Sequence, residues 1–288
     1  MIDPSLDPSL DPRIDLRIDP FIDHVLARGR ELYRDFPWRR TTDPYAILVS
    51  EVMLQQTQVS RVQRYYERWL QQFPTIDALA SASTADVLSA WQGLGYNRRA
   101  LALTRLASEV SEHHAGGIPT TREALLTLPG IGPATAAGIL IFAHDAPAPY
   151  LETNVRTVFL HELFPTSDDV PDREILPLVE EAGERVHTRH LSSRVWNYAL
   201  LDYGAHLKTI LPNPSRRSKH HSRQSTYEGS TRQKRAALLK AVLATPDQST
   251  ADLAAACDLE YDITEEILTT LATEGFLTHT KNHWSPAE

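Results

Sequence analysis

Hydrophobic residues recur at helical spacing along most of the chain from Phe21 onward, and runs that alternate with period two are few. Together with capping residues and first-turn prolines, this spacing predicts helices over 21–35, 44–56, 59–73, 84–92, 97–113, 122–128, 134–143, 153–163, 172–186 and 192–204. No period of roughly 20–50 residues recurs, so we expect a compact bundle rather than a solenoid. The pattern predicts an all-α fold class.

The pattern changes at both ends of this helical body, residues 21–211. Residues 1–20 repeat Asp and Pro with few apolar groups and predict a disordered leader. Residues 212–231 are rich in Pro, Ser, Arg and His, and predict an extended basic linker. Residues 232–288 show three short helical stretches and then a small apolar hairpin that leads to Trp284, which is the order of a winged helix.

Charge and cysteine content narrow the classes of function. The chain has 288 residues and a net charge of −8, which by itself argues against a nucleic-acid partner. The charge is segregated, however, because residues 208–240 hold nine Lys and Arg against one Glu, whereas residues 241–288 hold nine acids against one Lys. A single cysteine, Cys257, excludes a disulfide framework, a four-cysteine zinc site and a four-thiolate iron–sulfur cluster. With no export signal and no long apolar span, we expect no membrane partner.

The segment LTLPGIGPATAAGIL (126–140) is the first candidate for chemistry. Gly130 and Gly132 bracket a tight turn, and small residues such as Thr135 open the next helix. Glycines let backbone N–H groups approach an anion, and the helix start adds its positive dipole end. The segment therefore predicts a phosphate-binding hairpin, the alternative being an ordinary connection between helices.

The segment FPWRRTTDPYAILVSEVMLQQTQV (36–59) is the second candidate. In a helix over 44–56, Glu51 lies beside an apolar face that includes Leu48. Desolvation there would raise the pKa of Glu51 and allow it to act as a general acid near neutral pH. A lone helical Glu is usually a solvated surface group, so the surrounding motif is what favours the functional interpretation.

With WQGLGYNRRA (91–100) and NVRTVF (154–159), these segments resemble the helix-hairpin-helix DNA glycosylases, and within them most the MutY-type adenine glycosylases, over about residues 25–208. The resemblance implies a two-lobed helix-hairpin-helix glycosylase fold, here followed by a small winged-helix-like domain at the C-terminus. It implies double-stranded DNA with a mismatched or damaged base as the partner. The target nucleotide must leave the duplex, because its glycosidic bond cannot be reached inside the stack.

The resemblance also assigns roles to individual residues. Glu51 aligns with the acid that protonates the departing adenine. Arg39 and Leu48 correspond to residues of the base pocket, and Gln55, Gln56 and Tyr96 to residues that fill or wedge the vacated stack. Gly130, Gly132 and Thr135 correspond to hairpin residues that bind the DNA backbone. Arg216 and Arg217 are basic residues that would contact phosphates. The alternative for the last pair is a flexible linker.

A second carboxylate is expected because cleavage of an N-glycosidic bond builds positive charge on the sugar, which a nearby anion stabilises. The family places an aspartate where this chain has Glu152, and neighbouring Asn154 matches the family and could orient the site. We expect the longer side chain to carry its carboxylate about 1.5 Å farther from the backbone. Three interpretations stay open: a working substitute, a shifted mechanism or substrate, and an inactive enzyme.

Other departures from the family bear on mechanism. Ala134 stands where lyase-active members carry a lysine, so we expect a monofunctional enzyme that leaves an abasic site. Lys208 is the nearest later lysine, and nothing in the sequence places it in the pocket. The cluster-binding cysteines are absent, so we expect no iron–sulfur cluster and no other cofactor. The pair His220-His221 lacks a second pair of ligands at a suitable spacing, so it does not predict a metal site. A monovalent ion at the hairpin of residues 126–140 is compatible with the sequence.

The sequence thus predicts a base excision repair glycosylase, associated with the nucleoid in the cytoplasm, that removes adenine opposite guanine or 8-oxoguanine. One alternative keeps the fold and removes thymine, uracil or a modified base. Another is a DNA-binding protein without catalysis. The acidic domain 232–288 replaces the Nudix-like domain of typical family members and would suit a protein partner or a stabilising role.

Overall fold

The computed structural model describes residues 12–219 and 228–287, and its secondary structure is mainly helical. Two compact units divide the described chain. The first contains the residues up to Leu48, then Thr120–Leu126, and then Ile131 onward to the gap. The second contains Val49–Pro119, Thr127–Gly130 and the residues after the gap. The all-α prediction is confirmed by this architecture.

The predicted helices are present, most of them within three residues of their expected bounds. Helix α2 (Pro44–Leu54) starts where the Asp-Pro signal placed it, because an Asp43 carboxylate oxygen accepts from the Ala46 N–H at 3.0 Å. The other helices before residue 220 are α1 (Pro12–Glu31), α3 (Val59–Gln72), α4 (Ile76–Ala80), α5 (Thr84–Trp91), α6 (Arg98–His113), α7 (Arg122–Thr127), α8 (Pro133–His144), α9 (Thr153–Glu162), α10 (Asp172–Thr188) and α11 (Ser193–Ile210), with short 3-10 turns η2 (Pro37–Arg39) and η3 (Pro214–Arg217).

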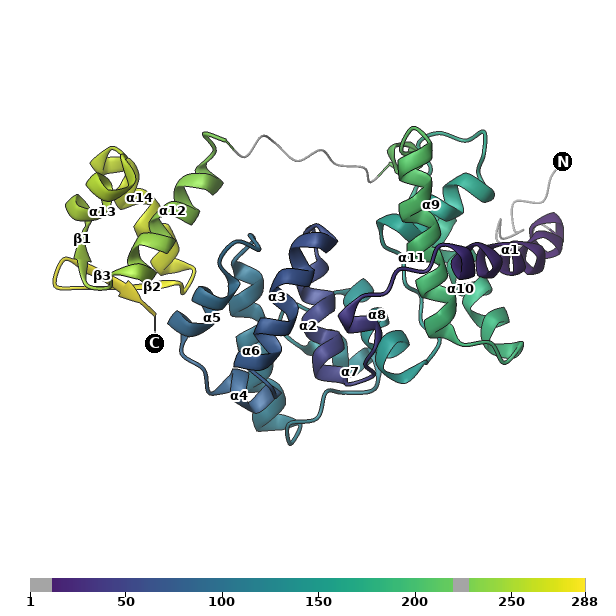
Figure 1. The fold of residues 1–288 in the computed structure, drawn as a ribbon, viewed down its shortest axis with the longest axis horizontal. Helices are drawn as coiled ribbons and strands as arrows, with labels where there is room; N and C mark the ends of the chain where they lie inside the picture. Colours follow the sequence, from purple (N-terminus) through teal and green to yellow (C-terminus); the bar gives the residue numbers. More distant parts are fainter. Residues whose placement is uncertain (1–11, 220–227, 288) are drawn as a thin grey trace, which may run out of the picture. The chain divides into compact units, whose positions relative to one another are not determined.

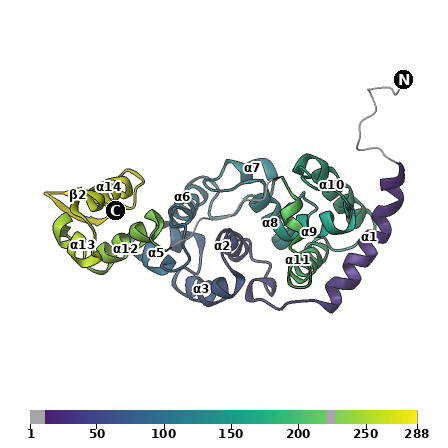
Figure 2. The same ribbon diagram turned by 90° about the horizontal axis from the view of Figure 1, so that it is seen from above.

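The first unit is built around helix α11. Figure 2 shows α1 lying beside α10 and α11, and these helices share one core with α8 and α9. Phe21 packs edge-on against Phe159 and Trp196, with ring centroids 5.0 and 5.8 Å apart. Large buried aromatic rings contribute strongly to core energetics, so the Phe21 ring of α1 helps to hold α9 and α11 in one core.

The N-terminal prediction was wrong beyond residue 11. Helix α1 begins at Pro12, and Ile18 is fully buried although it lies in the expected leader. Ile18, Phe21, Ile22 and Val25 recur at helical spacing on one buried face, whereas Pro20 faces solvent. Burial of that face outweighs the penalty of the internal proline. The rest of the expected leader, residues 1–11, lies outside the described residues.

The second unit has its own aromatic core. Trp69 of α3 packs edge-on against Trp91 of α5, with ring centroids 5.3 Å apart, and both rings are buried. The hydrophobic side of α6 is also buried in this unit, and α6 packs against α4 and α5. Helix α4 was not predicted, since five residues are too few to show a period.

The C-terminal domain has the predicted winged-helix order (Figure 1). It contains α12 (Thr231–Ala244), β1 (Gln248–Ser249), α13 (Thr250–Cys257), α14 (Tyr261–Thr273), β2 (Leu277–Thr280) and β3 (His283–Pro286). The strands form an antiparallel sheet in the order β1-β3-β2, with Thr280 paired to His283 across the turn. Buried Trp284 donates its indole N–H to the Thr250 hydroxyl at 2.9 Å and ties the sheet to α13.

The first residues after α11 are not extended as the linker prediction required. Pro214–Arg217 forms η3, which packs against α9, and Val170 and Ser218 form an isolated bridge. The polar and basic composition of this segment predicted a linker, and it gave no sign of the short 3-10 turn. Residues 220–227 lie outside the described chain, and none of the described helices combines the length and apolar character needed to span a membrane.

Candidate active site

Glu152 is the N-cap residue of α9. One carboxylate oxygen accepts from the backbone N–H groups of Asn154 and Val155, at 2.5 and 3.0 Å, and the other accepts from the Asn154 side-chain amide at 3.3 Å. Free N–H groups at a helix start favour a carboxylate in this place. The additional methylene of Glu152 therefore does not carry the carboxylate away from the helix, because the side chain folds back over the first turn.

Burial and hydrogen bonding act on Glu152 in opposite directions. Burial of the carboxyl group raises the pKa of Glu152, while the N–H donors of Val155 and Asn154 and the charge of Lys208 act to lower it. The net direction is upward, so burial is the larger effect. The N–H dipoles at the start of α9 thus offset part of the effect of burial on this carboxyl group.

Helix α11 approaches α9 closely at this point. A Cβ on Gly204 would lie 2.2 Å from the Asn154 carbonyl oxygen, so only glycine allows the two backbones to pack here. One helical turn later, Lys208 donates from Nζ to the Asn154 side-chain oxygen at 2.6 Å. The sequence assigned no place to Lys208, and the structure brings it to the predicted residue Asn154.

Arg39 occupies a buried ion pair in the first unit. Its two terminal nitrogens donate to the two oxygens of Asp202 at 2.7 and 2.9 Å, and Arg34 donates to the same carboxylate at 2.6 Å. The Arg39 guanidinium also lies 4.3 Å from the ring centre of Tyr198. Arg39 is 2% exposed at its side chain, and Leu48 is fully buried. The base-pocket assignment of these two residues stays a prediction.

Glu51 lies near the end of α2, a mainly apolar helix in which residues 45–50 are buried. Its neighbours Val52 and Met53 are buried, while Glu51 is half-buried. The predicted placement of a carboxyl group beside an apolar face is therefore present. Its predicted role as the general acid stays a prediction.

Arg99, which the sequence did not single out, holds together the end of α2 and the loop before α6. One terminal nitrogen donates to the carbonyl oxygens of Val52, Met53 and Gln55 at 2.8, 3.0 and 2.6 Å. The other donates to the Gly95 carbonyl at 2.8 Å. Burial lowers the pKa of Arg99 to about 10, so it remains protonated at neutral pH.

The loops that Arg99 holds contain the residues expected to enter the base stack. Gln56 and Tyr96 adopt left-handed backbone conformations, with φ of 53° and 50°. Tyr96 is 41% exposed, and Gln56 is exposed. Such conformations are uncommon outside glycine and mark positions where the surroundings dictate the backbone.

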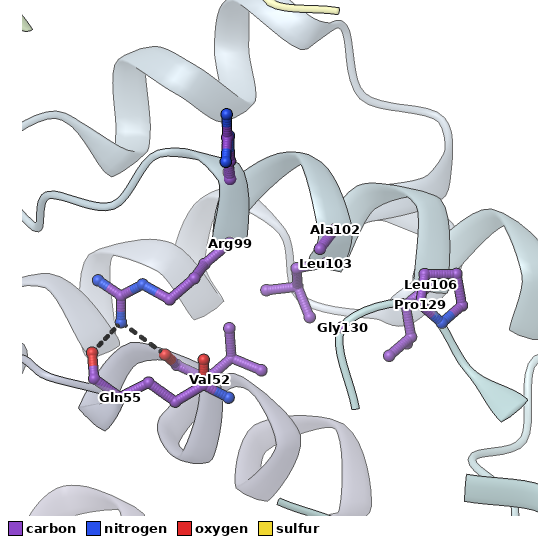
Figure 3. Close-up of a pocket in the computed structure, with 9 residues that line it drawn as sticks. Val52, Gln55, Arg99, Ala102, Leu103, Leu106, Pro129 and Gly130 are labelled. Atoms are coloured by element: carbon purple, nitrogen blue, oxygen red, sulfur yellow. Dashed lines mark hydrogen bonds between the residues drawn. The ribbon is translucent and has the colours of Figure 1, made fainter. Parts of the chain in front are cut away.

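A pocket of about 250 Å³ lies in the second unit beside Arg99 (Figure 3). Its lining residues are Val52, Gln55, Arg98, Arg99, Ala102, Leu103, Leu106, Pro129 and Gly130. Gly130 has a φ of 78°, and a Cβ there would lie 2.9 Å from the Ala102 side chain. The predicted turn glycine is thus required both by its backbone conformation and by its packing.

The rest of the predicted hairpin and the basic pair lie in the first unit. Gly132 is the N-cap of α8, and Thr135 is buried in that helix. Arg217 donates to the carbonyl oxygens of Leu160 and Phe164 at 2.9 and 2.6 Å and so caps the end of α9. Arg216 is exposed. The expected phosphate contacts of both arginines stay predictions, and Arg217 has a structural role besides.

The sequence missed Lys208 and Arg99 because their partners are distant along the chain. The only signal was spacing, since Gly204 and Lys208 lie one helical turn apart and must share a face. Among the described residues, no group of three or more His, Cys, Asp or Glu side chains is arranged to hold a metal ion. The lone Cys257, in α13, cannot supply the four thiolates of an iron–sulfur cluster.

Comparison with known proteins gives matches across this region. A family model described as HhH-GPD superfamily base excision DNA repair protein matches residues 49–183. The adenine DNA glycosylase of Mycobacterium tuberculosis is 45% identical over 136 residues, which are 47% of this chain and 45% of that protein. The adenine DNA glycosylase of Buchnera aphidicola is 32% identical over 181 residues, which are 63% of this chain and 50% of that protein.

The chain spans about half the length of the curated relatives it matches. Among solved structures, a thermostable thymine-DNA glycosylase superposes with a TM-score of 0.58 at 25% identity. The match covers 66% of this chain and 87% of that one.

Proposed function

We propose that the protein is a DNA N-glycosylase acting on adenine opposite guanine or 8-oxoguanine, on the premise that residues 49–183 match the HhH-GPD superfamily of base excision DNA repair proteins. The observation that carries this proposal is the half-buried Glu152 carboxylate, held by the start of α9 beside Asn154. A carboxyl group whose pKa is raised by burial, beside specific hydrogen-bond donors, is typical of catalytic sites, and DNA binding alone would not require one. Double-stranded DNA is accordingly the proposed partner.

The two carboxylates divide the chemistry. The bond between C1′ and the base breaks, its electron pair stays with the base, and Glu51 supplies the proton that neutralises the leaving group. The Glu152 carboxylate stabilises the cationic sugar. Water then adds to C1′ and returns a proton to Glu51, which leaves an abasic site. No cofactor takes part in this proposed sequence.

We further propose that the reaction stops at the abasic site. Cleavage of the strand by a lyase step needs an amine that attacks C1′ of the opened sugar. Ala134 has no such group, and the Lys208 amine is bonded to Asn154. Strand breaks should therefore require added alkali.

A second candidate substrate is thymine opposite guanine. It is favoured by the structural match to a thymine-DNA glycosylase, which covers most of that chain. The adenine proposal takes precedence because the adenine glycosylases match at higher identity.

Single-turnover cleavage decides between the candidates. The duplexes carry A:8-oxoguanine, A:G, T:G or U:G, and each product is analysed with and without hot alkali. Alkali-dependent breaks at adenine are expected. Breaks only at thymine or uracil would replace the adenine proposal, and tight binding without any product would overturn the enzymatic proposal.

Glu51→Gln and Glu67→Gln form a matched pair for the same assay. Glu51 is the proposed acid, whereas Glu67 is an exposed glutamate on α3 of the same unit. Loss of product in Glu51→Gln with full activity in Glu67→Gln is expected. Equal activity in both variants would refute the role of Glu51.

A further inference from the structure

A chain of three polar side chains runs from the last turn of α11 to the start of α9. Lys208 donates to the Asn154 side-chain oxygen at 2.6 Å, and the Asn154 amide nitrogen donates to Glu152 at 3.3 Å. Resting on the proposed function, we propose that Lys208 is a positioning residue for glycosidic cleavage. It fixes the amide of Asn154 and places a positive charge opposite the carboxylate that faces the sugar.

The hydrogen-bonding capacity of an ammonium group decides the orientation of Asn154. Lys208 has only donors, so it requires the oxygen of the amide on its side. The amide nitrogen must then point to Glu152, which has only acceptors when ionised. Without Lys208, the Asn154 amide loses one of the two partners that distinguish its orientations, and only the bond to Glu152 would still hold it.

The backbone of α11 sets the reach of Lys208. Gly204, one turn earlier, allows the Asn154 backbone to lie against α11, and the next turn then brings Nζ onto the amide. A side chain at position 204 would push the two helices apart. The bond between Lys208 and Asn154 therefore follows from the close packing of α9 and α11 at Gly204.

The other charged groups near Lys208 are already paired with carboxylates. Arg156 of α9 donates to both oxygens of Asp172 of α10 at 2.8 Å, and Arg34 is bonded to Asp202. Burial is the main effect that lowers the pKa of Lys208, and the charges of both arginines lower it as well. The charge of Glu152 acts in the opposite direction and raises it. Of Lys208, Arg156 and Arg34, Lys208 is the cation that is connected to Glu152 through the Asn154 side chain.

The electrostatic effect of Lys208 favours the ionised form of Glu152. Burial raises the pKa of Glu152, and the Lys208 charge opposes that rise. Removing the charge should therefore increase the pKa of Glu152 further and leave a larger protonated fraction at a given pH. A protonated Glu152 could not stabilise a cationic sugar, so the rate should fall on the acid side of the pH profile.

The first test does not require activity. The side-chain amide resonance of Asn154, assigned in isotope-labelled protein with Asn154→Asp, is followed against pH because the amide nitrogen bonds to Glu152. In Lys208→Met the titration midpoint should move to higher pH, and in Lys208→Arg it should stay near that of the unaltered protein. An unchanged midpoint in Lys208→Met would overturn the proposal.

The second test uses single-turnover cleavage at saturating enzyme. Lys208→Met should lower the rate constant by about 10- to 100-fold at neutral pH, as expected for a displaced or misoriented group. The acid limb of its pH profile should move upward, and Lys208→Arg should recover most of the rate. Unaltered cleavage in Lys208→Met, or weaker DNA binding with an unaltered rate constant, would overturn the positioning role and indicate a phosphate contact.

Thr209→Ala is the matched control for both tests. Thr209 is the exposed neighbour of Lys208, and its hydroxyl donates only locally, to the His206 carbonyl at 2.7 Å. It should retain the midpoint and the rate. If the unaltered protein cleaves none of the duplexes, the proposed glycosylase function fails, while the amide titration still decides whether Lys208 positions Asn154.

Discussion

Two carboxylates of the first unit, buried Asp202 and half-buried Glu152, have very different partners. Asp202 receives two arginines, Arg34 and Arg39, and its negative charge is fully compensated. Glu152 receives N–H dipoles of the α9 start and of Asn154, with the Lys208 charge one side chain away. A carboxylate saturated by guanidinium groups stabilises the fold, whereas one held by dipoles retains charge for a cation that appears during a reaction.

The largest expected effect is on Asp202. Asp202→Asn leaves two buried or partly buried arginines without their acceptor, and loss of one partner of a buried pair costs about 3–5 kcal/mol. Urea unfolding should show this decrease in the free energy of unfolding. A loss below about 1 kcal/mol would show that the Asp202 cluster is no more structural than an exposed ion pair.

Glu152→Gln should give the reverse result. The amide oxygen can still accept from the helix start, so stability should stay within about 1 kcal/mol of the unaltered protein. Cleavage should fall by about 10²- to 10³-fold, as for removal of one electrostatic stabiliser of a transition state. Glu152→Asp keeps both cap and charge and serves as the control. Full activity in Glu152→Gln would mean that the charge has no catalytic role.

Gly204→Ala tests the packing that joins the two regions. A methyl group would overlap the Asn154 carbonyl, so the helices must separate at a cost of about 1–3 kcal/mol. Thermal unfolding measures the loss. Gly183→Ala in α10, where a Cβ would meet nothing within 4 Å, is the control and should not be destabilised.

The smallest expected effect is on the pH dependence of stability. Because the folded protein raises the pKa of Glu152, the native state binds this proton more tightly than the unfolded chain. The stabilisation is complete below the unfolded pKa, near 4.5, and is lost as the pH rises through the folded value. Relative to Glu152→Gln, the unaltered protein should lose stability over that window by at most about 1.4 kcal/mol per pH unit. A parallel pH dependence in both proteins would contradict the shift.

Local sequence features predicted most helices and the start of α9 at the candidate site, while the roles of the site residues stay predictions. The Asp-Pro signal located α2, and the motif at 152–154 located the cap of α9, because caps depend on neighbours in the chain. Ile18 shows where this fails, since proline suggested disorder while burial of one helical face decided the outcome. Lys208 and Arg99 were missed because their contacts join residues more than 40 positions apart, which no local pattern records.

The carboxylate at position 152 shows a further limit of sequence reasoning. Counting bonds predicted that the longer side chain would displace the charge, but the N–H groups of α9 draw the carboxylate back. The backbone conformation at the cap, rather than side-chain length alone, determines where the charge lies. This observation favours Glu152 as a working substitute among the three interpretations.

Arg99 also bears on how the protein would recognise a duplex. It connects the segment at 52–57 with the loop at 94–95, so the two loops lose their conformational freedom together when the chain folds. Under the proposed function, Gln56 and Tyr96 would then meet DNA already ordered, and the entropic penalty of association would be smaller. Because Arg99 orders both loops before DNA binds, we expect the complex with DNA to dissociate more slowly than it would with flexible loops.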